Sequence, residues 1–99
     1  MRRRNGIDYG LVPAHMLGSI QRYIERGQPI GSFLTALLSN DLNLTFGRAD
    51  EGNRGAIGDW VTFLWNEAPE DCWGSGAKVE AWQARGGRMV GTTVEASAE

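Results

Sequence analysis

The sequence predicts a small all-α protein, a compact bundle of four to five short helices with flexible tails at both ends. Apolar residues recur at helical spacing in three separate stretches of the chain. Glycine, proline and helix-capping residues separate these stretches. The 99 residues suffice for one hydrophobic core, so we expect a single domain across 1–99, with an ordered part over about 11–86.

The first predicted helix opens at Pro13, which suits a first turn, and closes at Gly27. Its apolar face consists of Met16, Ile20, Tyr23 and Ile24. A second helix is predicted over 33–39, with Ser32 as its N-cap. Between 41 and 49 the apolar residues alternate, which also suits a strand. We favour a helix there, because a lone strand would lack a partner for its backbone groups.

Residues 50–68 carry the strongest periodic signal and predict a central helix. Gly52, Gly55 and Gly58 each cost about 1 kcal/mol relative to alanine inside a helix, so we expect a late start or fraying there. Pro69 ends the helix. The expected buried face holds Ile57, Trp60, Val61, Leu64 and Ala68.

A last short helix is predicted between Ser75, its expected N-cap, and Gly86. Residues 1–10 and 87–99 show no periodicity. We expect both segments to be flexible tails.

Composition and charge narrow the classes of partner. A net charge of -2 and a pI near 5.4 disfavour general binding to nucleic-acid phosphates, although Arg2–Arg4 form a local basic run. No apolar signal region follows these arginines, and no run of about 18 apolar residues occurs, so we expect neither export nor a membrane span. A single cysteine excludes internal disulfides and favours a cytoplasmic location.

Catalytic chemistry is not indicated. A cysteine or serine nucleophile needs a base, and the only histidine, His15, lies far in sequence from the only cysteine, Cys72. We expect His15 to be a surface or half-buried structural residue and Cys72 to be a small buried hydrophobe. One histidine and one cysteine leave only carboxylates to complete a metal site. The sequence therefore predicts no enzyme, no metal and no cofactor.

A polar constellation between the two most apolar segments is the candidate ligand-binding site. Its residues either cap and cross-link helices, with Asp50 and Arg54 pairing at i, i+4, or line a pocket. In the pocket, Arg48 or Arg54 would meet an anionic group while a tryptophan stacks on a flat ring. The candidate residues are Asn40, Asp41, Arg48, Asp50, Asn53, Arg54, Trp60, Trp65 and Trp73.

Trp65 widens the apolar arc of the central helix beyond what so short a chain can cover. An uncovered apolar arc indicates a pocket or a subunit interface. We therefore expect a homo-oligomer, most simply a dimer.

Several segments carry a family resemblance, notably GSFLTALLSNDL (31–42), GRAD (47–50) and CWGS (72–75). From about Val12 to Arg85 the chain resembles a family of small proteins encoded by bacteriophages and prophages. The resemblance implies phage origin, expression in the bacterial cytoplasm and a stoichiometric accessory role, but no particular activity. The EGNRGAIGDW stretch (51–60) and the tail after Arg85 depart from the family pattern.

Three classes of function follow, in order of preference. The first is a phage-encoded counter-defence or host-modulating protein that sequesters a nucleotide signal or blocks a host protein. The second is a nucleic-acid-associated protein that uses Arg2–Arg4 with Arg22 and Arg26. The third is an enzyme built mainly from carboxylates, for which no residue pair stands out.

Overall fold

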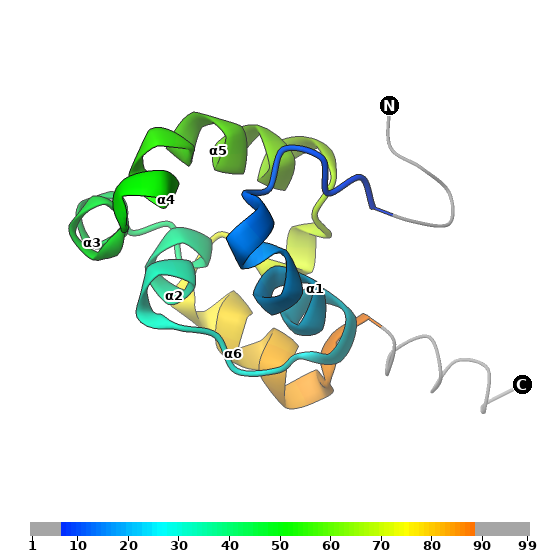
Figure 1. Cartoon of the computed structure of the whole chain (residues 1–99). Helices are drawn as coiled ribbons and strands as arrows, with labels where there is room; N and C mark the ends of the chain where they lie inside the picture. The colour runs from blue at the N-terminus through cyan, green and yellow to red at the C-terminus, as the bar shows by residue number, and fades with distance from the viewer. Residues whose placement is uncertain (1–6, 89–99) are drawn as a thin grey trace, which may run out of the picture.

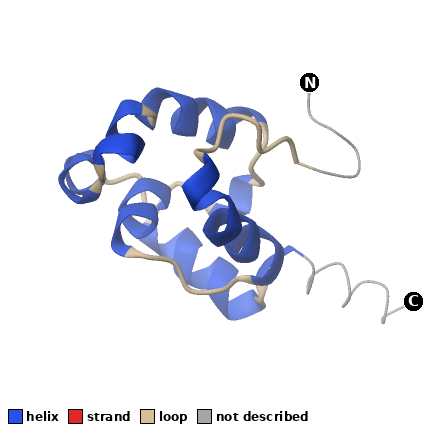
Figure 2. Ribbon diagram, viewed as in Figure 1, coloured by secondary structure: helices blue, strands red, loops and turns tan. Residues whose placement is uncertain are grey.

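The computed structural model describes residues 7–88, and every regular element in that range is helical (Figures 1 and 2). The all-α class is confirmed. The helices pack into one body in which α1, α2, α5 and α6 surround the core and α3 lies at an outer edge (Figure 1). In chain order the elements are η1 (Ala14–Met16), α1 (Leu17–Arg26), α2 (Ser32–Leu38), α3 (Leu42–Arg48), α4 (Glu51–Gly55), α5 (Ile57–Asn66), η2 (Glu70–Cys72) and α6 (Gly76–Arg85).

The first predicted helix forms as a 3-10 turn, η1, followed by α1. It stops at Gly27, whose left-handed φ of 68° lets the backbone turn back. Ile20, Tyr23 and Ile24 are fully buried, as the periodicity predicts.

The segment 41–49 is helical, so the favoured interpretation is confirmed over the strand. Asp41 caps α3 by accepting a hydrogen bond from the Leu44 N–H at 3.1 Å. Just before it, Asn40 takes a φ of 66°, which reverses the chain between α2 and α3. One detail of α2 differs from expectation, because Gly31 takes the N-cap position and Ser32 is the first helical residue.

The predicted central helix is two helices. Asp50 caps α4, which ends at Gly55, and Ala56 leaves helical geometry with φ -105° and ψ 9° before α5 begins. The break falls in the glycine-weakened region, where helix formation gains least. Because packing sets the orientation of α5, Phe63 is fully buried while Val61, an expected core residue, is 43% exposed.

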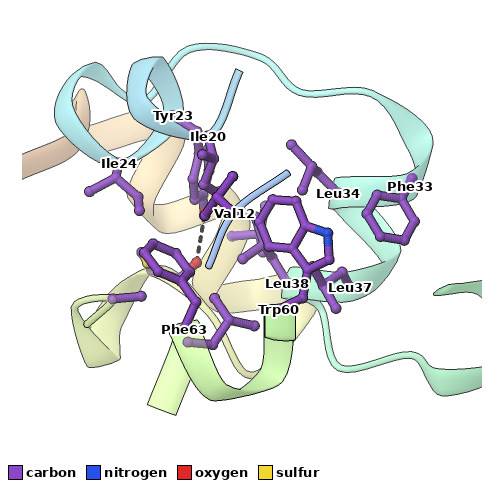
Figure 3. Close-up of a cluster of buried hydrophobic side chains, with 14 of the residues drawn as sticks. Val12, Ile20, Tyr23, Ile24, Phe33, Leu34, Leu37, Leu38, Trp60 and Phe63 are labelled. Carbon is purple, nitrogen blue, oxygen red and sulfur yellow. Dashed lines mark hydrogen bonds between the residues drawn. The ribbon is translucent and has the colours of Figure 1, made fainter. Parts of the chain in front are cut away.

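The core forms where Trp60 and Phe63 of α5 enter the space between α1 and α2 (Figure 3). Trp60 meets the rings of Phe33 and Phe63 edge-on, with centroids 6.0 and 6.3 Å away. Buried hydrogen bonds link elements that are far apart in sequence. The Tyr23 hydroxyl of α1 donates to the Cys72 carbonyl of η2 at 2.6 Å. Trp82 of α6 donates its indole N–H to the carbonyls of Tyr23 and Ile24.

The body extends beyond the expected ordered range at both ends. Tyr9 packs against Phe63 with ring centroids 5.4 Å apart, and Arg88 pairs with Glu25 at 2.6 Å. The run Arg2–Arg4 and residues 89–99 of the predicted tail (87–99) lie outside the described residues. Among the helices of 7–88, none has the length and apolarity needed to cross a bilayer.

Candidate functional site

Asp50 and its neighbours hold helices together. One oxygen of Asp50 accepts the Asn53 N–H at 2.7 Å, and the other lies 3.2 Å from His15 Nε2. The hydrogen bond from Asn53, followed by the contact with His15, lowers the pKa of Asp50. The expected Asp50–Arg54 pair does not form within 7–88; Arg54 donates instead to the Phe46 carbonyl at 3.4 Å. These contacts support the structural interpretation of Asp50.

Asn53 and Trp60 belong to the core. Asn53 is 2% exposed, and its side-chain oxygen accepts the indole N–H of the fully buried Trp60 at 3.2 Å. Trp60 therefore has no free face on which a ligand could stack. The prediction that it is a ligand-binding residue is wrong, and its role is structural.

Trp65 and Trp73 are the tryptophans that reach the surface. Trp65 on α5 is 71% exposed, while Trp73, in the turn after η2, is half-buried against the core. Their rings meet edge to face, with centroids 5.9 Å apart and planes at 73°. Trp73 thus supports one side of Trp65 and leaves the rest of that ring open.

A hollow of about 380 Å³ lies beside this pair, and we call it the tryptophan cleft. Leu64 and Ala68 contribute apolar surface to it, and Glu70 and Lys78 contribute one charge of each sign. Its lining comprises Leu64, Trp65, Ala68, Glu70, Trp73, Gly74 and Lys78. Such a surface suits an apolar or aromatic group flanked by polar atoms.

A second hollow, of about 130 Å³, adjoins the same two tryptophans on the α3 side. It brings Asn40 and Asp41 together with Trp65 and Trp73, so four of the predicted site residues converge. Leu42 (68% exposed) and Val61 also line it, and they extend the apolar surface outward from the cleft.

Arg48 lies apart from the tryptophans. It borders a groove of about 430 Å³ between α2 and α3, with Asp41 and Leu44. The predicted combination of an arginine with a stacking tryptophan in one pocket is therefore not formed in this structure.

Sequence reasoning missed Leu42, Glu70 and Lys78 as site residues. The period-two spacing of Leu42, Leu44 and Phe46 held the missing signal, since a helix with that spacing cannot bury all three side chains. Glu70 and Lys78 gave no signal, because they meet only through the turn that joins η2 to α6.

A larger hollow of about 480 Å³ is lined by Tyr9, Gln21, Arg22, Glu25 and Arg26. It contains the two arginines of the nucleic-acid hypothesis. Glu25 lines the same hollow and is paired with Arg88, so this ion pair adds no net charge to that of the two arginines.

The catalytic candidates do not assemble a site. Cys72 is fully buried, and burial raises the pKa of its thiol from 9.0 to about 12, so the thiol is protonated at neutral pH. His15 is held by Asp50 at the surface. Within residues 7–88, no three side chains of the His, Cys, Asp and Glu types gather closely enough to hold a metal ion.

Searches against protein-family models, curated proteins and solved structures find no match to this chain.

Proposed function

We propose that this protein is a non-catalytic binding protein that blocks a host protein by taking one of its apolar side chains into the tryptophan cleft. The observation that carries the proposal is Trp65: a large aromatic ring, 71% exposed, beside a hollow with apolar walls. Exposed tryptophans next to a pocket are typical of residues that dominate protein interfaces.

The charges at the cleft favour a protein over a nucleotide. Lys78 is the one cation in the cleft lining, and Glu70 accompanies it. A nucleotide phosphate needs a cationic or N–H-rich pocket, whereas a protein surface tolerates balanced charge at a polar rim. Trp65 and Trp73 also meet edge to face, so they do not form the parallel walls that would enclose a flat base.

We extend the proposal to the biological setting that the sequence resemblance implies, in which the protein is of phage origin. A phage accessory protein that acts stoichiometrically in the bacterial cytoplasm would block a defence or regulatory protein without needing catalysis. The buried thiol of Cys72 and the tethered ring of His15 agree with a non-catalytic role.

The test is to capture partners from bacterial lysate on the immobilised protein, purify the captured partner and titrate it with variants. We expect Trp65→Ala to weaken binding by roughly 30-fold, which corresponds to a hot spot of about 2 kcal/mol. Asn66→Ala is the matched control, because Asn66 is the next residue of α5, is exposed and lines a different hollow with Asp8 and Leu11. Equal affinity of wild type and Trp65→Ala would contradict the proposal.

The nucleic-acid hypothesis is the second candidate, carried by Arg22 and Arg26 on one hollow. It predicts that DNA or RNA mobility shifts at low salt and that Arg22→Ala with Arg26→Ala removes the shift. No shift for single- or double-stranded probes would exclude it.

A further inference from the structure

Helix α3 buries little of its own surface. Of its seven residues Thr45 is buried, whereas Leu42, Leu44 and Phe46 are exposed by 68%, 45% and 43%. α3 stands at the outer edge of the body, next to α2 (Figure 1). Leu42 borders the hollow beside the two surface tryptophans, whereas Leu44 projects from the opposite side of the helix.

On that opposite side, Leu44 and Arg48 line a groove of about 430 Å³. Asp41, at the start of α3, lines this groove and also the hollow beside the tryptophans. Leu44 and Arg48 are one helical turn apart, and Asp41 precedes Leu44 by nearly a turn. An acid, a leucine and a base therefore follow one another along a single edge of α3. We call this edge the α3 ridge.

Both charges of the α3 ridge are open to a partner. Arg48 is exposed and makes no ion pair with any residue of 7–88. Asp41 uses one oxygen to cap Leu44 N–H, and a carboxylate retains further lone pairs for a guanidinium.

We propose that a second copy of this chain docks on the α3 ridge, with the two α3 helices antiparallel about a two-fold axis at Leu44. In this arrangement Asp41 of each copy faces Arg48 of the other, and the two Leu44 side chains meet between them. A two-fold interface requires a self-complementary surface, and an acid and a base at opposite ends of one short helix satisfy that requirement. Antiparallel helices also oppose their dipoles favourably.

The groove supplies the remaining contact surface. Its α2 wall presents Ser32, Thr35 and Ser39, and its apolar floor comes from Ile30 and Ala36. α3 of the second copy would rest against this wall, so α2 and α3 of both copies form a four-helix contact. The ion pairs lie at the surface, so we expect a weak, reversible dimer that dissociates as salt rises.

The test is sedimentation equilibrium of the full chain from micromolar to millimolar concentration, at low and high salt. Wild type should dimerise, and Arg48→Glu should weaken the dimer at least tenfold by placing two acids opposite each other. Asp41→Asn retains an N-cap side chain but loses the charge, so it should weaken the dimer less. Circular dichroism should show unchanged helix content for both variants.

Two controls separate this proposal from others. Arg26→Glu makes the same charge change at an exposed site in the last turn of α1, off the ridge, and should leave the dimer intact. Trp65→Ala should also leave it intact, because Leu44 and Arg48 line neither of the two hollows that Trp65 borders. A monomer at all concentrations, a dimer that survives Arg48→Glu, or a dimer lost only with Trp65→Ala would each overturn the proposal. None of these outcomes depends on whether the cleft binds a host protein.

Discussion

The hydrogen bond between Asn53 and Trp60 joins two buried side chains in the core. The indole N–H of Trp60 is buried, and Asn53 accepts its hydrogen bond at 3.2 Å. Truncating Asn53 would leave that donor without a partner in a site that water does not reach, which costs more than the hydrogen bond itself contributes.

We therefore expect Asn53→Ala to lower the free energy of unfolding by about 1–3 kcal/mol. Asn43→Ala is the control, since Asn43 is exposed on α3 and should change stability by less than about 0.5 kcal/mol. Urea unfolding followed by circular dichroism measures both. Equal losses of unfolding free energy for the two substitutions would contradict a stabilising role of the buried hydrogen bond.

Because the thiol of Cys72 is buried, the free energy of unfolding should decrease as pH rises through the alkaline range. Its pKa is about 12 in the folded protein and 9.0 in the absence of burial, so the unfolded chain loses this proton first. Stability from this group is complete below pH 9 and falls as pH rises from 9 towards 12. Between about pH 9 and 10, before tyrosines ionise, Cys72→Ala should lose less stability than wild type. Parallel pH profiles of the two proteins in urea unfolding would contradict this.

At this scale the sequence predicted some roles and not others. Cys72 was expected to be a buried hydrophobe, and its complete burial confirms this. A lone cysteine has no disulfide partner in the chain, so packing in the core was the simplest role to predict for it. The roles of Asn53 and Trp60 were not separable from those of ligand-binding residues. A buried polar pair and a ligand-binding pair use the same residue types, and only burial distinguishes them.

At the scale of elements, the helix ends follow local chemistry. Asp41, Asp50 and Ser75 each accept a hydrogen bond from the N–H three residues later, and Gly27 and Gly86 end their helices in left-handed geometry. These features depend on neighbours in sequence, so the helix boundaries were largely predictable. The rotation of α5 buries Phe63 and exposes Val61. It depends on packing against α1 and α2, so it could not be predicted from neighbours in sequence.

Glycines test the difference between local and tertiary constraints. Gly58 lies in the first turn of α5, and no other side chain or segment comes within 4 Å of the position that a Cβ would take. Gly58→Ala should therefore stabilise the protein by about 0.5–1 kcal/mol.

Gly87 has a φ of +81°, and a Cβ there would come within 2.5 Å of the backbone nitrogens of Arg26 and Gly27. Gly87→Ala should destabilise by more than about 1 kcal/mol. Thermal unfolding compares the two variants, and a stable Gly87→Ala protein would contradict the close approach of these backbones.

At the scale of the whole molecule, the small core explains why apolar side chains remain outside. The helices of 7–88 are short, and they enclose Trp60, Tyr23 and Phe63 completely. Within 7–88, little of the chain is left to cover α3 or the outer side of α5. The prediction that the apolar arc of the central segment exceeds the core is confirmed by the exposure of Trp65. The position of the cleft was not predictable, because it forms where the turn carrying Trp73 returns to α5.

The central claim is that Trp65 serves recognition and not folding, and the free energy of unfolding of Trp65→Ala tests it most directly. Since its main packing is one edge contact with Trp73, we expect a loss of less than about 1 kcal/mol. Trp60→Ala, measured in parallel, should cost about 3–5 kcal/mol as a core truncation. A loss for Trp65→Ala as large as that for Trp60→Ala would contradict the claim.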